Sequence, residues 1–120
     1  MTFEVNVFVQ RSTMQRHAQI IHLRPEAEAA YKKCHQAVWP EVLSRITDSN
    51  IRNYSIFLRD GILFSYFEYV GSDFVTDMAK MAVDTKTQEW WAITNPMQKP
   101  LEDRGKNEWW ASMGEIFHSD

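Results

Sequence analysis

The chain has 120 residues, of which 44% are hydrophobic and 13% aromatic. This is enough for one packed core and too little for two ordinary domains. The formal net charge is only -3, from 13 basic and 16 acidic residues that are interspersed along the chain. Neither nucleic acid nor a membrane is therefore an expected partner. A single cysteine, Cys34, excludes an internal disulfide, and together with the lack of an N-terminal signal pattern it predicts a cytoplasmic protein.

The first core strand is predicted at Gln15–Leu23, where apolar and polar side chains alternate along QRHAQIIHL. The preceding residues 1–13 alternate only weakly, so we predict that they form either an N-terminal extension or an extra edge strand. Residues 14–120 are predicted to form one domain.

Two helices are predicted to follow this strand. Pro25 suits the first turn of a helix that continues to about residue 38. Its buried stripe is expected to contain Ala27, Ala30, Tyr31, Cys34 and Val38. Pro40 breaks this helix and opens a short second one, which the turn-forming residues 48–50 end.

A β-hairpin is predicted around Asp60-Gly61, which lies between two alternating apolar runs at residues 53–59 and 62–70. Aspartate and glycine tolerate the positive φ angles of a tight primed turn. We therefore expect two antiparallel strands joined by this turn.

Two further helices are indicated by capping residues. Ser72 is a candidate N-cap for a helix with a methionine-rich core stripe. Thr85 and Gln88 have the spacing of a capping box, so a separate short helix that carries Trp90 and Trp91 is predicted to start there. This helix is expected to stop near residues 95–96.

The C-terminal part is predicted to contain a long exposed loop at residues 98–108, because this run is polar and holds Pro100 and Gly105. A last strand is predicted at residues 109–118, with Gly114 marking a bulge or a close approach.

The element order predicts an α+β fold of the ferredoxin-like βαββαβ type, with an antiparallel sheet and helices on one face. Residues 62–70 carry apolar side chains on both faces of the strand. Because the face away from the helices also needs cover, we predict a symmetric homodimer.

The leading acid/base candidate is His35, since histidine is the side chain whose ordinary pKa lets it donate and accept protons near neutral pH. Tyr31 lies four residues earlier, so both side chains project from one helix face and can reach one small pocket. Of the other histidines, His17 and His22 lie on opposite faces of one strand, and His118 is close to the C-terminus.

Other common chemistries lack their motifs. The sequence has no HExxH and no closely spaced histidines with a carboxylate, so no metal site is predicted. It has no glycine-rich phosphate loop and no GxSxG elbow, so neither a cofactor nor serine hydrolysis is expected. Cys34 falls on the stripe beside alanines, which favours a small buried hydrophobe over a nucleophile.

Tryptophan is unusually frequent, with five residues of which four form the pairs Trp90-Trp91 and Trp109-Trp110. Consecutive helical residues point about 100° apart, so when one ring is buried its neighbour tends to line a cleft. Exposed aromatic faces beside hydroxyl and amide groups, here Tyr54 and Asn53, are suited to binding a sugar.

Taken together, these motifs resemble those of the L-rhamnose mutarotase family from about Met14 to the C-terminus. The resemblance rests on the first strand QRHAQIIHL, on Tyr31 and His35 as Y-x-x-x-H, on V-W-P-E at residues 38–41, on Asn53-Tyr54, on Trp90-Trp91, and on M-x-E-I-F at residues 113–117.

This resemblance implies a dimeric ferredoxin-like α/β barrel and an enzyme that interconverts the α and β anomers of a 6-deoxy-L-sugar without cofactor or metal. It implies that His35 is the proton donor, that Tyr31 and Tyr54 contact the sugar, and that Trp90 and Trp91 form the wall of the site. The chain departs from the bacterial rhamnose enzymes at its N-terminus, at Cys34 and in the loop at residues 99–107, so L-fucose stands beside L-rhamnose as a candidate substrate.

Two alternative functions remain open from the residues alone. The same scaffold hosts other cofactor-free enzymes, such as monooxygenases and decarboxylases, because fold does not dictate function. A non-catalytic domain that holds a small ligand is the other alternative. A mutarotase should exchange sugar anomers, a binding domain should bind sugar without exchange, and an oxygenase should consume oxygen with an aromatic substrate.

Overall fold

The structure is a computed structural model that describes residues 14–120. Residues 1–13 lie outside it, so both alternatives for that segment stay predictions. In chain order the elements are β1 (Gln15–Leu23), the 3-10 turn η1 (Pro25–Ala27), α2 (Glu28–His35), α3 (Pro40–Asp48), β2 (Ile51–Arg59), β3 (Ile62–Tyr69), α4 (Phe74–Ala82), α5 (Thr85–Thr94), the 3-10 turn η2 (Asn95–Met97), β4 (Gln98–Lys99) and β5 (Ala111–Met113).

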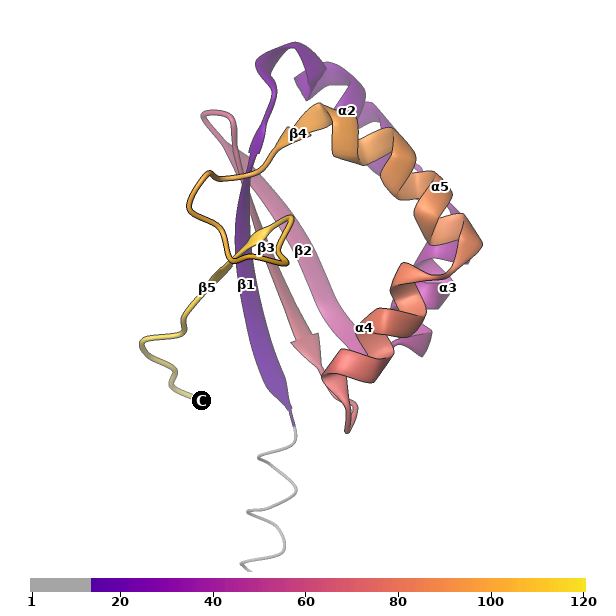
Figure 1. Cartoon of the computed structure of the whole chain (residues 1–120), viewed down its shortest axis with the longest axis vertical. Coiled ribbons are helices and arrows are strands. Elements are labelled where there is room, and N and C mark those ends of the chain that lie inside the picture. Colours follow the sequence, from indigo (N-terminus) through magenta and orange to yellow (C-terminus); the bar gives the residue numbers. More distant parts are fainter. Residues whose placement is uncertain (1–13) are drawn as a thin grey trace, which may run out of the picture.

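The sheet has the strand order β2-β3-β1-β4, and β5 also pairs with β1. Every pair of neighbouring strands is antiparallel. The helices α2, α3, α4 and α5 all lie on one side of the sheet, as a curved layer that faces β1, β2 and β3 (Figure 1). The predicted α+β class, with an antiparallel sheet and helices on one face, is confirmed.

The hairpin between β2 and β3 forms as the turn residues dictate. Asp60 and Gly61 have φ angles of 50° and 74°, which a primed turn requires and which these two residue types tolerate. Arg59 is then paired with Ile62, and the register continues along both strands. The predicted antiparallel pair is confirmed.

Alternation decides which side chains the sheet buries. Ile21 and Leu23 of β1 face the helices with Leu63 of β3, and all three are at most 2% exposed. Ile21 lies directly opposite Leu63 in the register. Burying an aliphatic side chain of this size stabilises the fold by about 1.5–3 kcal/mol, so a one-residue slip of β1 would be strongly disfavoured.

A β-bulge interrupts β2, where the register shifts between Arg52 and Ser55. Asn53 and Tyr54 therefore face the single residue Phe67 of β3, and Asn53 has a φ of 51°. Asparagine adopts positive φ more readily than most residues. The extra residue lets Tyr54 point to the helix side of the sheet, where its ring packs edge-on against Phe67 at 5.8 Å.

The core on the helix side is divided into two clusters. The first contains Ile21, Leu23, Tyr31 and Leu63. The second contains Ile51, Phe67 and Met81. Members of both clusters line one cavity of about 520 Å³. The space between the helix layer and the sheet is therefore only partly filled, which provides room for a ligand.

Two helix caps differ from those predicted. The N-cap of α4 is Asp73 and not Ser72, since Asp73 accepts from the backbone nitrogen of Thr76 at 3.2 Å. The N-cap of α5 is Asp84 and not Thr85, because Asp84 accepts from both the backbone nitrogen and the hydroxyl of Thr87. Aspartate outcompetes the neighbouring hydroxyl because a carboxylate is the stronger acceptor near the helix dipole.

The first helix is shorter than predicted. It begins as η1 and ends at His35, and Ala30 of the expected stripe is exposed. By contrast, α3 begins at Pro40 and ends at Asp48 as expected. In the described residues, no helix is long and apolar enough to cross a membrane.

The C-terminal part differs most from expectation. Gln98–Lys99 pairs with β1 and Gln98 is buried, so the predicted exposed loop begins only after β4. The predicted last strand at residues 109–118 shrinks to Ala111–Met113. No other atom would lie within 4 Å of a Cβ placed on Gly114, so it marks neither a bulge nor a close approach.

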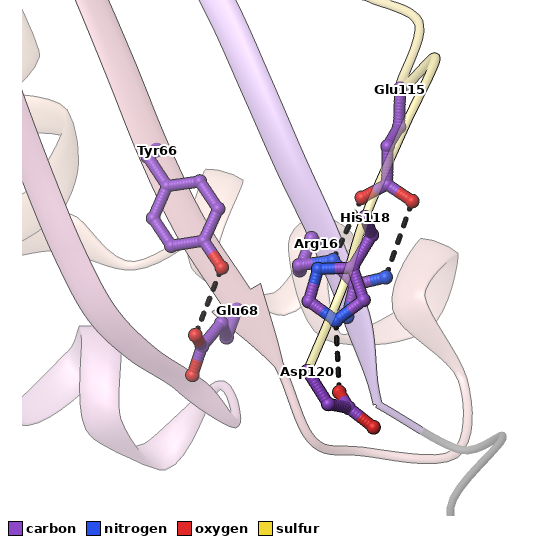
Figure 2. A network of polar contacts seen from close by, with 6 residues as sticks. All are labelled: Arg16, Tyr66, Glu68, Glu115, His118 and Asp120. Carbon is purple, nitrogen blue, oxygen red and sulfur yellow. Dashed lines mark hydrogen bonds and ion pairs between the residues drawn. The ribbon is translucent and has the colours of Figure 1, made fainter.

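Polar side chains hold the chain after β5 against β1. Figure 2 shows the Arg16 guanidinium donating to both carboxylate oxygens of Glu115, at 2.7 and 3.2 Å. Tyr66 donates to Glu68 at 2.9 Å in the same view. Because Glu68 is the register partner of Arg16, this network lies on the face of the sheet away from the helices.

Candidate active site

Two cavities lie between the helices and the sheet. The first has a volume of about 430 Å³ and is lined by His35 together with apolar residues of α3 and β2. The second, of about 520 Å³, is lined by Trp90 and Trp91 among others. Tyr31 and Tyr54 line both. Of the six predicted site residues, five therefore lie at one pair of adjoining cavities.

The tautomer of His35 follows from its backbone contact. Its Nδ1 lies 2.8 Å from the carbonyl oxygen of Tyr31, one turn earlier in α2. A carbonyl only accepts, so the proton of the neutral ring is on Nδ1. Within residues 14–120 no protein group is hydrogen-bonded to Nε2. The imidazole is thus held in one orientation, with Nε2 free to exchange a proton with a ligand.

Cys34 also contacts the backbone carbonyl oxygen of Tyr31. Its Sγ lies 3.2 Å from the Tyr31 oxygen and 3.3 Å from Nδ1 of His35. Burial raises the pKa of the Cys34 thiol, which keeps it protonated. The thiol therefore acts as a local donor within α2.

The two phenols are both kept neutral by their surroundings. Burial raises the pKa of Tyr31 to about 12, although a hydrogen bond from Gln98 opposes the shift. Burial also raises the pKa of Tyr54 to about 12. At neutral pH both side chains can donate a hydrogen bond.

Trp90 connects the two cavities. It lines the second and is only 7% exposed, and its ring meets the His35 ring edge-on at 5.5 Å. On its other side it packs edge-on against Trp39 at 5.3 Å. Trp91 is half-buried and lines the second cavity together with Met78. Both members of the pair therefore face the same space.

Asn53 lies elsewhere. Its side chain donates to Glu68 at 2.7 Å, on the face of the sheet away from the helices, and it lines neither cavity. The structure gives it a different task, which is to supply the positive φ of the bulge that aims Tyr54 at the cavities.

The other histidines lie outside both cavities. The His17 ring is stacked on Phe67 and Phe74, at 4.9 and 4.4 Å between centroids. His22 and His118 are exposed. Among the described residues, no group of three histidine, cysteine, aspartate or glutamate side chains is placed to hold a metal ion.

The chain is similar to known proteins over most of its length. The sequence model of the L-rhamnose mutarotase family matches residues 16–119. An L-rhamnose mutarotase from Oceanobacillus iheyensis is 30% identical over 109 residues, which are 89% of this chain and 100% of the relative. Another, from Listeria monocytogenes, is 37% identical over 91 residues, covering 72% of this chain and 82% of the relative. This chain belongs to the L-rhamnose mutarotase family. It is an isomerase that acts on a sugar.

The fold is also shared with a solved mutarotase. The crystal structure of an L-rhamnose mutarotase from Formosa agariphila matches with a TM-score of 0.69 at 23% identity. The match covers 88% of this chain and 99% of that one. The α+β architecture of this mutarotase-family chain is therefore that of a known structure.

The sequence reasoning missed one buried residue of the candidate site. Gln98 lines the second cavity and is 4% exposed. It donates to the Tyr31 hydroxyl at 3.0 Å and accepts from the Trp109 indole nitrogen at 2.8 Å. A glutamine inside a polar run gives no local sign of burial, whereas the Trp109-Trp110 pair was a visible signal that this segment contacts the core.

Proposed function

We propose that this chain interconverts the α and β anomers of L-rhamnose by general acid/base catalysis, with His35 as the proton-transferring residue. The observation that carries this is the His35 ring, fixed through Nδ1 and free at Nε2, in a cavity that it shares with two protonated phenols. The names of the relatives support L-rhamnose as the sugar. L-fucose, another 6-deoxy-L-sugar, is the second substrate to test.

Anomer exchange needs two proton movements. A proton is delivered to the ring oxygen while the anomeric hydroxyl loses one, so the bond between C1 and the ring oxygen breaks and an open aldehyde forms. The aldehyde rotates and the ring recloses on its other face with the roles reversed. His35 donates through Nε2 in its charged form and accepts there in its neutral form, and a hydroxyl or water takes the partner role.

The enzyme needs to lower the activation barrier of anomer exchange by only a modest amount. The uncatalysed exchange is already fairly fast, so a lowering of the barrier by a few kcal/mol suffices. A positioned acid/base residue contributes about 10²–10⁴-fold, which is the required range. Trp90 and Trp91 supply apolar faces for the C–H patches of the sugar, and Tyr31 and Tyr54 supply donors for its oxygens.

The test is the rate of anomer exchange in His35→Ala, followed by saturation-transfer NMR with L-rhamnose and with L-fucose. We expect the catalysed rate to fall by about 10²–10⁴-fold, because the proton donor is removed. His118→Ala is the matched control, since this exposed histidine contacts only the C-terminal segment and should leave the rate unchanged. Exchange by His35→Ala at the rate of the unmodified protein would exclude His35 as the donor.

We also propose that two copies form a symmetric dimer through the face of the sheet away from the helices, completing a ferredoxin-like α/β barrel. That face carries Phe57, Ile62 and Met113, which are 60%, 37% and 45% exposed. Phe57 and Phe64 lie side by side there, 6.4 Å apart. An antiparallel sheet that is apolar on both faces is typical of a sheet covered by a second subunit. The cytoplasmic location stays a prediction.

A further inference from the structure

We infer that Gln98 and Trp109 are positioning residues that fix the direction in which the Tyr31 hydroxyl donates its proton, so that this hydroxyl acts as a hydrogen-bond donor toward the sugar. This deepens the proposed mutarotase activity and rests on it. The three side chains form a chain of two hydrogen bonds: Trp109 Nε1 to Gln98 Oε1 at 2.8 Å, and Gln98 Nε2 to the Tyr31 hydroxyl at 3.0 Å.

The indole of Trp109 determines the direction of both hydrogen bonds. An indole nitrogen can only donate, so the atom of the Gln98 amide that faces Trp109 must be its oxygen. The amide nitrogen then faces Tyr31 and can only donate to it. The phenol oxygen accepts this bond, and its own proton is directed elsewhere.

The remaining direction for that proton is into the cavities. Tyr31 is 5% exposed and its ring is packed in the first core cluster with Ile21 and Leu63. Tyr31 lines both cavities, so they are the open space toward which its hydroxyl proton can turn. A sugar oxygen placed there would meet a donor whose direction is already set, without the cost of reorienting a free hydroxyl.

The chain of hydrogen bonds is built on rigid elements. Gln98 is 4% exposed and lies on β4, where it is paired with Leu23 of β1. Trp109 precedes β5, which pairs with β1 along the same edge as β4. Two short segments anchored side by side on this edge of β1 thus hold the amide between the indole and the phenol. Exposed glutamines have no such restriction on their amide orientation.

Gln98→Glu reverses the direction of the hydrogen bond to Tyr31 while keeping the size of the side chain. The carboxylate accepts from Trp109 as before but also accepts from Tyr31, so the phenol turns its proton away from the sugar. We expect kcat for L-rhamnose exchange at neutral pH, measured well below the thermal midpoint, to fall by about 10-fold or more, the loss of one oriented hydrogen bond. The thermal midpoint should also fall, because a carboxylate replaces a neutral amide at a position that is 4% exposed.

A pH series separates positioning from a merely structural role. Once protonated, the new carboxyl group again accepts from Trp109 and donates to Tyr31, as the amide does. The rate of Gln98→Glu relative to the unmodified protein should therefore rise as the pH is lowered. Gln15→Glu adds the same charge at the distant start of β1, where the side-chain oxygen that contacts His17 is kept, and its relative rate should stay flat.

The outcomes are distinguishable. A rate ratio for Gln98→Glu that is near one, or lowered but independent of pH, overturns the positioning role even if the unmodified protein is active. Failure of the unmodified protein to accelerate exchange overturns the proposed function itself. Trp109→Phe, which removes the anchoring N–H donor and keeps an aromatic ring, should lower kcat more than it raises KM, and an effect on KM alone would contradict the inference.

Discussion

At the scale of single residues, Tyr31 joins the core to the site. Its ring belongs to the cluster formed with Ile21, Leu23 and Leu63, and its backbone oxygen orients His35 at 2.8 Å. Its side chain lines both cavities, and its hydroxyl accepts from Gln98. Packing therefore fixes one residue whose backbone in turn orients His35, the proposed acid/base residue, which is how a site becomes preorganised.

The raised pKa of Tyr31 predicts a loss of stability at alkaline pH. The unfolded chain releases the phenol proton near 10.0, whereas the folded chain keeps it until about 12. The stabilisation is therefore complete below pH 10 and falls as the pH rises toward 12, by up to about 2 kcal/mol for this group. Urea unfolding at pH 8 and pH 11.5 measures this fall.

Tyr31→Phe should unfold at lower urea than the unmodified protein at pH 8, because the Gln98 amide loses its acceptor, at a cost of about 1–3 kcal/mol. Its stability should nevertheless depend less on pH between 10 and 12, since the shifted phenol is gone. An equal alkaline fall in both proteins would show that the Tyr31 phenol is not the group that titrates.

Sequence reasoning reached His35 and Tyr31 because their spacing on a helix is a local property. The sequence alone could not predict the tautomer of His35 or the direction of the Tyr31 hydroxyl proton. These depend on a carbonyl, a buried amide and an indole from three parts of the chain. Asn53 shows the converse, because it neighbours Tyr54 in the sequence, yet it adopts the positive φ of the bulge and lines neither cavity.

At the scale of elements, a buried polar contact joins α4 to the end of β3. The Tyr69 hydroxyl donates to Asp77 Oδ2 at 2.5 Å, and Asn50 Nδ2 donates to the same oxygen at 2.9 Å. The Tyr69 hydroxyl bond, followed by that from Asn50, lowers the pKa of Asp77. Asn50 lies two residues after the end of α3 and has a φ of 65°. One carboxylate therefore connects the turn after α3, the end of β3 and the first turn of α4.

Gly71→Ala should disrupt this junction. A Cβ at position 71 would overlap the Tyr69 phenol and lie 2.8 Å from Asn50 Nδ2. Overpacking of this kind costs about 1–3 kcal/mol. The free energy of unfolding, measured with urea, should fall by that amount. Gly114→Ala is the matched control, since no other atom lies within 4 Å of its added Cβ. Equal stability of the two variants would show that the contacts around residue 71 accommodate the added Cβ with no loss of free energy of unfolding.

The elements that sequence predicted well are those with a strong local signal. Strand alternation located β1 to the residue, and the turn at Asp60-Gly61 located the hairpin. The short strands β4 and β5 were misjudged because two or three residues are too few to show a period. Their pairing with β1 is set by contacts of high sequence separation, which a local pattern cannot display.

At the scale of the whole molecule, the space between the sheet and the helix layer is filled at two places only. The two core clusters leave adjoining cavities of about 430 and 520 Å³ between them. A core split in this way gives up packing energy that a continuous one would provide. Trp90 and Trp91 line the second of these cavities. No sequence period reveals a space that is left empty.

The uncovered face of the sheet predicts the state of assembly. If two copies pair there, the unmodified protein should have twice the mass of one chain in light scattering coupled to size-exclusion chromatography. Phe57→Asp places a charge in that interface, where an unpaired buried charge is costly, and should shift the protein toward the single-chain mass. Val75→Asp is the matched control, because Val75 is 77% exposed on α4, within the helix layer, and its mass should stay doubled. A single-chain mass for the unmodified protein would instead mean that the exposed Phe57 serves some purpose other than assembly.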